Sequence, residues 1–215
     1  MAEARVAVAT ADGRLFYELV GELKRRGISF IVRCPGEPLP FTVKAALTSE
    51  AEASKVKGLA RPDLKVVTCR AGEVGLAVAE ALLAAYGLPP EAHETLTIGI
   101  DPGEIMGYAA VVGGIVVDKG SYSSVERLLE AIERSVREWK PRRLKVKVGG
   151  RPNGGGIAQQ LKSFLDKLSA RFDLRVELQF VDEAGTTVRA RRLGAKHKEA
   201  DEASAIEIAL RGQEG

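Results

Sequence analysis

Acidic residues stand at three places in the second half of this 215-residue sequence where a strand is expected to end or a helix to begin. If the first and last strands of that half lie near each other and the last helix packs over them, these acids meet at one end of a sheet. Acids gathered without histidine or cysteine favour hard cations such as Mg²⁺ or Mn²⁺, which prefer oxygen ligands. Two such ions can flank a phosphodiester and assist its hydrolysis. The acids are Asp101 after the strand 96–100, Asp182 and Glu183 after the strand 175–181, and Asp201 in the helix 199–211.

Each acid has a simpler interpretation when it is considered alone. Asp101 precedes Pro102 and Gly103, and all three residue types favour surface turns. Glu183 could cap the following segment or lie in solvent. Asp201 suits the first turn of a helix, where an acid interacts favourably with the helix dipole. The order and setting of the acids, taken together, favour a metal site over these separate explanations.

The elements that would hold these acids follow a first block, residues 1–90, in which strands and helices alternate. Alternation of this kind predicts a small Rossmann-like α/β domain with a parallel sheet. Gly87 suits a helix C-cap, and Pro89 and Pro90 cannot continue a helix, so a domain boundary is expected near residue 90. The predicted elements are strands 5–10, 28–34 and 64–69 and helices 12–26 and 72–86, with an uncertain stretch before residue 57.

The second block, residues 91–215, is expected to form a mixed five-stranded sheet flanked by helices. Three strands linked by hairpins come first, and Gly113 and Gly114 supply one of the turns. Helices and two further strands then alternate, which predicts a sheet with both antiparallel and parallel pairs. The predicted elements are strands 96–100, 108–112, 115–119, 144–148 and 175–181 and helices 124–138, 157–171 and 199–211.

Composition narrows the classes of protein that this chain can represent. No stretch is long and apolar enough for a membrane span, and the first ten residues lack the pattern of a signal peptide. The cysteines, Cys34 and Cys69, are far apart and form no zinc or disulfide pattern, which fits a reducing cytoplasm. Asn153 is the one asparagine while Glu, Lys and Arg are plentiful, a balance typical of thermophilic proteins.

Basic residues are concentrated in two clusters although the net charge is only +3. One cluster is KPRRLKVKVGGR, residues 140–151, and the other is RARRLGAKHK, residues 189–198. A solvated strand edge and an exposed loop would explain them, but two clusters in one half of a nearly neutral chain also suit contacts to a phosphate backbone. The candidates for nucleic-acid binding are Arg142, Arg143, Arg151, Arg189, Arg191, Arg192, Lys196 and Lys198.

Three ordered motifs between about residues 95 and 212 carry a resemblance to a known superfamily. They are IGIDPGEIMGYAAV, then KVGGRPNGGGIAQQLKSFLDKL, then VELQFVDEAGTTVRARRL with KEADEASAIEIAL. Together they resemble the RNase H-like superfamily, specifically the RuvC Holliday-junction resolvases and the YqgF-like nucleases linked to ribosomal RNA maturation. The resemblance implies an RNase H-like fold with Mg²⁺ or Mn²⁺ as cofactor. It also implies that Asp101, Glu183 and Asp201 are the catalytic metal ligands, with Asp182 as a substitute for Glu183.

The sequence departs from that pattern in three respects. RuvC enzymes place an acid at the end of the fourth strand, where this chain has Gly149 and Gly150, so the nearer kin are YqgF-like. Those proteins commonly have an arginine after the Asp-Glu pair, where this chain has Ala184. They are also single domains, so residues 1–90 have no counterpart, and these differences bear on substrate contacts.

Three hypotheses about function follow from these observations. The first is a metal-dependent nuclease or resolvase that hydrolyses phosphodiester bonds in structured DNA or RNA by a two-metal mechanism. The second is a nucleic-acid-binding protein that keeps the RNase H-like fold without turnover. The third is an actin-like phosphotransferase or ATPase, which would need two Asp-x-Gly hairpins where this chain has one. The expected partner is nucleic acid rather than a membrane, with a homodimer as an open option.

Overall fold

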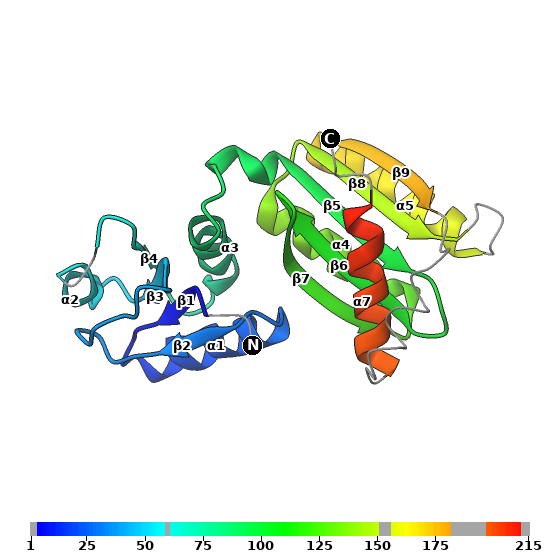
Figure 1. Ribbon diagram of the computed structural model, residues 1–215. Coiled ribbons are helices and arrows are strands. Elements are labelled where there is room, and N and C mark those ends of the chain that lie inside the picture. Colours follow the sequence, from blue (N-terminus) through cyan, green and yellow to red (C-terminus); the bar gives the residue numbers. More distant parts are fainter. Residues whose placement is uncertain (1–3, 59–60, 151–155, 182–196, 212–215) are drawn as a thin grey trace. The chain divides into compact units, whose positions relative to one another are not determined.

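The computed structural model describes residues 4–58, 61–150, 156–181 and 197–211, and for residues 90, 156 and 197–199 it describes the backbone alone. The chain divides into two compact units, Met1–Ala92 and His93–Gly215. Each unit contains its own sheet (Figure 1). Helices within the described ranges are too short or too polar to span a bilayer.

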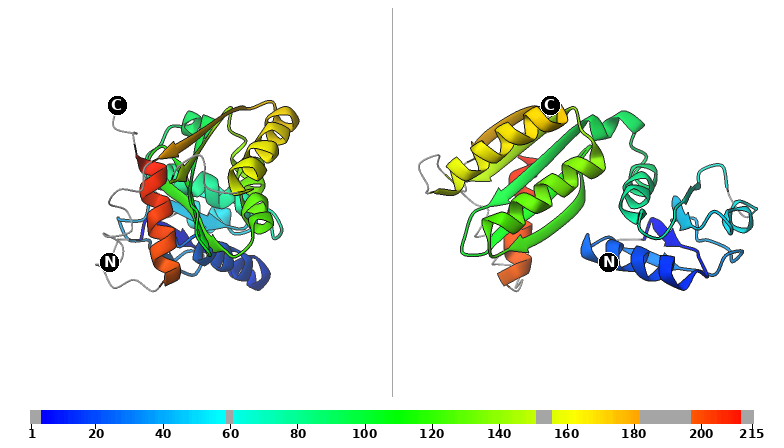
Figure 2. Two further views of the ribbon diagram at one scale, coloured as in Figure 1. Left: turned by 90° about the vertical axis from the view of Figure 1, so that its right-hand side faces the viewer. Right: turned by 180° about the vertical axis from the view of Figure 1, so that it is seen from behind.

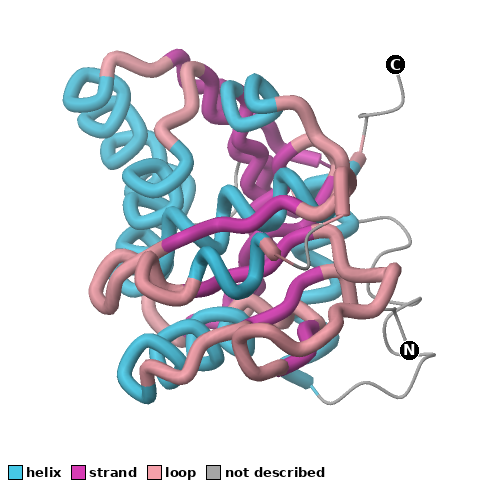
Figure 3. Tube along the Cα trace, turned by 90° about the vertical axis from the view of Figure 1, so that its left-hand side faces the viewer, coloured by secondary structure: helices cyan, strands magenta, loops and turns pink. Residues whose placement is uncertain are grey.

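The first unit is built on a four-stranded parallel sheet with the order β2-β1-β3-β4. Strands and helices alternate along this part of the chain, except that β3 follows β2 without a helix between them, and Figure 3 distinguishes strands from helices by colour. The parallel α/β domain predicted from the sequence is therefore confirmed. Its elements are β1 Val6–Val8, α1 Gly13–Arg25, β2 Phe30–Val32, β3 Ala45–Thr48, α2 Ala53–Lys57, β4 Lys65–Thr68 and α3 Val74–Ala85, and the 3₁₀ helix Pro90–Glu94 follows.

Helix α1 shows how the sequence specifies these elements. Asp12 is the N-cap, and its side chain accepts hydrogen bonds from the backbone N–H groups of Arg14 and Leu15. Leu15, Leu19 and Leu23 recur every four residues and are all buried. This spacing places them on one face of the helix, which packs against the unit's core.

Strand β3 is the element that periodicity did not reveal, because its four residues Ala-Ala-Leu-Thr are all buried. A strand that is covered on both faces shows no alternation of apolar and polar residues. Alanine also has a low preference for strands, so the segment lacks the usual composition signal. It nevertheless lies between β1 and β4 and is paired in parallel with both.

The second unit contains a mixed five-stranded sheet with the order β7-β6-β5-β8-β9. The first three strands are antiparallel, and β8 and β9 run parallel to β5, so the predicted sheet is confirmed. Gly113 and Gly114 form the turn between β6 and β7 with φ angles of 56° and 81°, which favour glycine. The elements are β5 Thr95–Asp101, β6 Met106–Val112, β7 Ile115–Tyr122, α4 Val125–Trp139, β8 Arg143–Gly149, α5 Gly156–Phe172, β9 Arg175–Val181 and α7 His197–Leu210.

Helices cover both faces of this sheet. Figure 2 shows α4 and α5 on one face and α7 on the other. The core on the α4 and α5 side consists of residues that alternate along the strands and are level with one another across the sheet. Its central members are Leu96, Ile98 and Ile100 of β5 and Leu144, Val146 and Val148 of β8, each 2% exposed or less. The intervening residues of each strand therefore point to the opposite side of the sheet, the side on which α7 packs.

Candidate functional site

Asp101 is the last residue of β5, and this strand lies in the middle of the sheet between β6 and β8. A central strand is held on both sides by hydrogen bonds, so its end is a rigid mount for a side chain. Across the antiparallel pair Asp101 is level with Gly107 of β6. Gly99, two residues earlier, faces α7, because a Cβ placed on it would collide with the backbone of Ala205. The side chains of a strand alternate, so Asp101 projects from the same face as Gly99.

Helix α7 brings Asp201 to the same position. A Cβ placed on Gly107 would collide with the backbone carbonyl oxygen of Asp201, so the helix rests directly on this glycine. Gly107 is also the residue level with Asp101 on the neighbouring strand, where Cβ atoms of opposed residues are roughly 4.5 to 5.5 Å apart. The backbone of Asp201 on α7 therefore lies next to the carboxyl end of β5, where Asp101 is located. Both residues are half-buried.

Two lysines of the sheet bind helix α7, which carries Asp201. Near its start, the Nζ of Lys119 on β7 lies 3.1 Å from a carboxylate oxygen of Glu202. Near its end, the Nζ of Lys147 on β8 donates a hydrogen bond of 3.0 Å to the carbonyl of Ala209 and a second one to the carbonyl of Arg211. A cation is favourable at this end of a helix, where carbonyl groups lack partners within the helix.

Lys147 belongs to the first basic cluster of the sequence, but it is only 5% exposed. Burial lowers its pKa, and the nearby charge of Lys145 lowers it further. A side chain so placed is engaged with the end of α7 and is not available to a phosphate backbone. Lys147 is a structural residue of this unit, and Lys145, two residues earlier, is more exposed.

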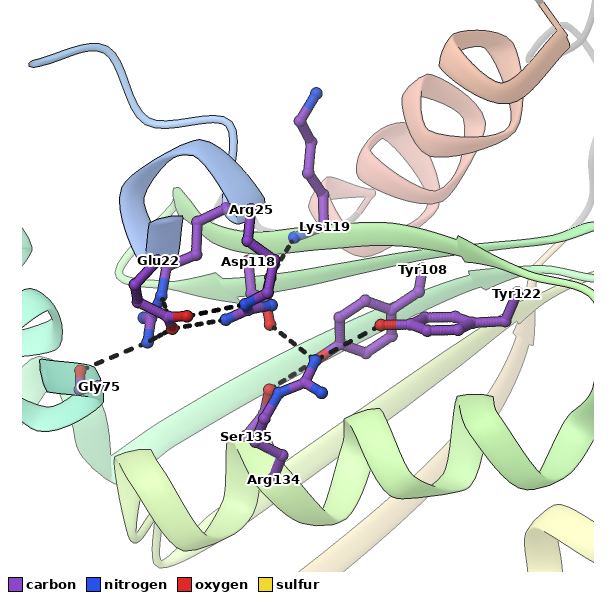
Figure 4. A network of polar contacts seen from close by, with 10 residues as sticks. Glu22, Arg25, Gly75, Tyr108, Asp118, Lys119, Tyr122, Arg134 and Ser135 are labelled. Carbon is purple, nitrogen blue, oxygen red and sulfur yellow. Dashed lines mark hydrogen bonds and ion pairs between the residues drawn. The ribbon is translucent and has the colours of Figure 1, made fainter. Parts of the chain in front are cut away.

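A separate polar cluster lies on the opposite face of the sheet (Figure 4). The Tyr108 hydroxyl and the Ser135 hydroxyl are 2.6 Å apart, and Arg134 lies 3.4 Å from the buried carboxylate of Asp118. Burial raises the pKa of Tyr108, and the charge of Asp118 acts in the same direction. Tyr108 is level with Ile100 and not with Asp101, so this cluster faces α4. It attaches α4 to the sheet and does not contribute to the carboxylate site.

The first unit also has a carboxylate near the ends of two of its strands. This carboxylate, Glu52, already accepts hydrogen bonds from three residues of the same unit. Glu52 accepts hydrogen bonds from the Thr10 hydroxyl at 2.5 Å, the Ala11 N–H at 2.8 Å and the Ser49 hydroxyl at 2.7 Å. Burial would raise its pKa, but the hydrogen bonds from Thr10, Ser49 and Ala11 outweigh burial and lower it. Glu52 thus joins the loops that follow β1 and β3.

Two of the four predicted metal ligands, Asp101 and Asp201, lie on described elements whose backbones approach each other at Gly107. Asp182 and Glu183 lie outside the described residues, but β9, the strand that precedes them, ends at Val181. Val181 is level with Gly149 at the carboxyl end of β8, which is itself next to the end of β5. The strands β5, β8 and β9 are parallel, so their carboxyl ends meet at one edge. The last strand is two positions from β5, roughly 10 Å away, and is not its direct neighbour.

Aspartate and glutamate oxygens suit Mg²⁺ or Mn²⁺, and Asp101 and Asp201 supply two such side chains. Glu202 is already paired with Lys119. Within the described ranges, no three His, Cys, Asp or Glu side chains are gathered in a way that could hold a metal ion. A complete metal site at this edge therefore requires a further ligand from the segment after β9.

The predicted nucleic-acid contacts are only partly described. Arg142 is exposed and lies 3.7 Å from Glu94, and Arg143 at the start of β8 lies 3.8 Å from Glu177. Both are at the opposite end of β8 from Asp101, a separation of about 20 Å at 3.3 Å per residue. Arg151, Arg189, Arg191, Arg192 and Lys196 lie outside the described residues, as does the side chain of Lys198.

Reasoning from the sequence did not identify the glycines and lysines that position α7. Gly99 and Gly107 lie within strands, and a glycine inside a strand is a known sign of close approach by another backbone. The sequence contains this sign twice, at Gly99 before Asp101 and at Gly107 after it. The role of Lys147 could not be inferred, because nothing in its local sequence distinguishes a buried lysine from the exposed lysines of the same cluster.

Comparison with known proteins agrees with this architecture. Residues 5–85 match the response regulator receiver-like domain. A "Putative pre-16S rRNA nuclease" of Actinobacillus pleuropneumoniae serotype 5b (strain L20) is 36% identical over 88 residues, and the match covers 38% of this chain and 63% of that protein. The protein of the same description from serotype 7 (strain AP76) has the same identity and coverage. The chain thus spans somewhat less than two thirds of the curated relatives.

Solved structures with a similar arrangement include two of RuvC and one of a mitochondrial resolvase. The complex of T. thermophilus RuvC with Holliday junction substrate is 16% identical, with a TM-score of 0.36 and coverage of 54% of this chain and 90% of that chain. The yeast mitochondrial Holliday junction resolvase Ydc2 is 14% identical, with a TM-score of 0.34 and coverage of 66% and 84%.

The second unit has an RNase H-like fold of the RuvC and YqgF type, as the strand order and the similarity to the curated relatives show together. The first unit is receiver-like. The chain is a distant homologue of the curated pre-16S rRNA nuclease relatives.

Proposed function

We propose that the second unit is a nuclease that requires Mg²⁺ or Mn²⁺ and hydrolyses phosphodiester bonds in structured nucleic acid. The observation that supports this proposal is that the backbone of Asp201 lies over Gly107, the residue level with Asp101 on the neighbouring strand. In this proposal Asp101, Asp201 and Glu183 hold the metal, and Asp182 replaces Glu183 if the latter is turned away. The similarity to curated relatives described as pre-16S rRNA nucleases supports the same class of reaction.

The residues of the chain have distinct tasks in this reaction. Asp101 provides a fixed oxygen ligand at a strand end, while Pro102 and Gly103 turn the chain away from the edge. Asp201 provides a second ligand from the second turn of α7, which begins at His197. When bound, divalent ions supply an activated water and neutralise charge that develops on the phosphate. No serine or histidine nucleophile is needed.

Positioning is the second contribution of the protein. Gly99 and Gly107 let α7 lie directly on the sheet, and the ion pair of Lys119 with Glu202 holds the start of the helix. The two carboxylates carry the same charge, so they repel each other when no cation is present. A cation that binds there relieves this repulsion and stabilises the folded state.

A cleavage panel tests the proposal. The substrates are branched DNA, duplex DNA, single-stranded RNA and an RNA–DNA hybrid, each with Mg²⁺, Mn²⁺ or a chelator. We expect metal-dependent cleavage of at least one substrate by the wild type and none by Asp101→Asn or Asp201→Asn. The matched control is Asp166→Asn on the exposed side of α5, which should cleave as the wild type does.

The panel also separates nuclease activity from binding without turnover. Metal-independent binding of a substrate that is never cleaved would contradict the nuclease and favour a binding protein with the same fold. Cleavage by Asp101→Asn at the wild-type rate would contradict the assignment of the site.

A further inference from the structure

One face of β8 and β9 is left uncovered by the described helices. Helix α7 lies along β6 and β5 and touches β8 near Lys147, while α5 packs on the other side of β9. Figure 1 shows β9 clear of α7. The residues of β9 alternate accordingly, with Arg175, Glu177 and Gln179 exposed and the intervening ones half-buried.

Parallel pairing arranges the side chains of this face in rows. Arg143 is level with Arg175, and Lys145 is level with Glu177. Lys147 and Gln179 form the next row, closer to the edge that carries Asp101. Arg142 precedes the first row and is exposed, and its carbonyl accepts a hydrogen bond from the N–H of Arg175. We name Arg143, Lys145 and Arg175 the basic face.

The charges of the basic face are not cancelled by their neighbours. Glu177 is the one acid among the residues of β8 and β9 that the structure describes on this side, and it lies 3.8 Å from Arg143. Glu94 lies 3.7 Å from Arg142. The side chains in both ion pairs are at least 43% exposed, so each pair is screened by water and easily exchanged for another anion. Three cations of the basic face thus lie beside one weakly held acid, Glu177.

This face shares its side of the sheet with Asp101. Arg143 is level with Thr95 at the start of β5, and Asp101 is six residues further along that strand. At 3.3 Å per residue the basic face lies about 20 Å from Asp101. One strand of a nucleic acid advances about 3.4 Å per nucleotide, so about six nucleotides would connect the two positions.

We infer that the basic face is a phosphate-binding surface that holds the substrate strand about six nucleotides from the scissile bond. This inference rests on the proposed function, because it takes nucleic acid as the occupant. It adds Lys145 and Arg175 to the substrate contacts and assigns Arg143 to a distant part of the substrate. It also sets a minimum substrate length, since a strand that is too short cannot reach both positions.

Binding experiments in a chelator test this surface without cleavage. Fluorescence anisotropy is measured for single strands of about four and about twelve nucleotides over a range of salt. The variant Arg143→Gln, Lys145→Gln and Arg175→Gln should bind the longer strand about 100-fold more weakly at 0.1 M salt, and its log–log salt slope should be shallower by about two units. A strand of about four nucleotides makes fewer phosphate contacts, so its affinity should fall in the same variant by a smaller factor than that of the longer strand.

Two further variants control for charge and for folding. Glu177→Gln removes the acid that is level with Lys145 and paired with Arg143. This variant should bind the longer strand severalfold more tightly, and damage to the fold would not produce such a gain. Lys162→Gln with Lys167→Gln neutralises exposed lysines of α5 on the other side of the sheet and should leave binding unchanged.

The outcomes distinguish this surface from the proposed nuclease. If the wild type binds and cleaves but the triple variant binds the longer strand equally well, the basic face is not a substrate surface and the nuclease stands. If the triple variant weakens binding while no substrate is ever cleaved, the surface stands and the nuclease does not. If no nucleic acid binds to the wild type, or a polyglutamate peptide occupies the face in its place, the inference is wrong.

Discussion

At the scale of single residues, the proposed chemistry depends on two carboxylates whose positions follow from backbone placement. Asp101 ends a central strand, and Asp201 lies over Gly107, the residue level with Asp101. Neither acid is unusual in its local sequence, since Asp-Pro-Gly suits a turn and an acid suits the first turn of a helix. Their type and order could be predicted from the sequence, but their proximity depends on strand register and on the path of α7.

The buried Lys147 provides a test at this scale. Replacement of Lys147 with methionine removes the donor to the carbonyl groups of Ala209 and Arg211. We expect the free energy of unfolding to fall by about 1 to 3 kcal/mol, because these carbonyls lose their partner. Lys145→Met serves as the control and should change stability by less than about 0.5 kcal/mol. Urea denaturation measures both, and equal stability of the two variants would refute the role assigned to Lys147.

A second residue-scale prediction concerns Glu22 of the first unit (Figure 4). Its carboxylate is hydrogen-bonded to Arg25 at 2.7 Å and to Arg26 at 2.8 Å. Burial by itself would raise the pKa, but the hydrogen bonds and charges of Arg25 and Arg26 outweigh it and lower the pKa from 4.5 to about 2. The folded state therefore prefers ionised Glu22. The resulting stability is present in full above pH 4.5 and is lost as the pH falls from 4.5 towards 2.

The variant Glu22→Gln should remove this pH-dependent contribution. At pH 7 we expect it to lower the free energy of unfolding by up to about 3 kcal/mol, and near pH 2 the difference from the wild type should vanish. Glu80→Gln is the control, because the ion pair of Glu80 with Lys65 is 55% exposed on both sides and contributes little. Urea denaturation at several pH values measures the effect, and a constant difference from pH 2 to 7 would show that Glu22 does not act through ionisation.

At the scale of elements, the sequence predicted most of the fold because hydrophobic periodicity identifies amphipathic helices and half-covered strands. Helix α1 and the three hairpin strands of the second unit carry that signal clearly. The fully buried β3 carries none and was not assigned. The strand order could not be predicted from the sequence either. The separation of β5 from β9 by β8 results from pairing between segments that are distant in sequence.

The packing of α7 on Gly107 makes a prediction for this element. In Gly107→Ala the added methyl group meets the backbone of Asp201 and has no space. We expect α7 to shift outward, with a loss of about 1 to 3 kcal/mol in the free energy of unfolding and a weaker response of the melting temperature to Mn²⁺. Gly21→Ala is the matched control, because nothing lies within 4 Å of the added Cβ and the site is inside a helix. That change should stabilise the protein by about 0.5 to 1 kcal/mol.

The paired measurement isolates steric contact from the general effect of adding a methyl group. If Gly107→Ala were as stable as the wild type and kept its full response to Mn²⁺, α7 would not rest on this glycine. The closeness of Asp101 and Asp201 would then need another explanation.

At the scale of the whole molecule, the two units have separate sheets and separate hydrophobic cores. All of the proposed metal ligands and the basic face belong to the second unit. The receiver-like unit contributes none of them, and its Glu52 is engaged by Thr10, Ala11 and Ser49. Chemistry and substrate contact are therefore assigned to the second unit.

This division predicts that the segment from His93 to Gly215 folds and functions without the first unit. We expect the isolated segment to unfold in a single cooperative transition and to keep the metal-dependent cleavage of the full chain, because it contains a complete sheet with helices on both faces. Circular dichroism and the cleavage panel provide the measurements. A folded segment without activity would show that the first unit supplies part of the active site or of the substrate contacts.

The central claim is that Asp101 and Asp201 are ligands of the same divalent metal site. Isothermal titration calorimetry with Mn²⁺ tests it most directly, using the wild type, Asp101→Asn, Asp201→Asn and the double variant. The account predicts binding by the wild type, loss of binding in either single variant and no further loss in the double variant, because the two side chains serve the same site. It is contradicted if the wild type does not bind Mn²⁺, or if either single variant binds as tightly as the wild type.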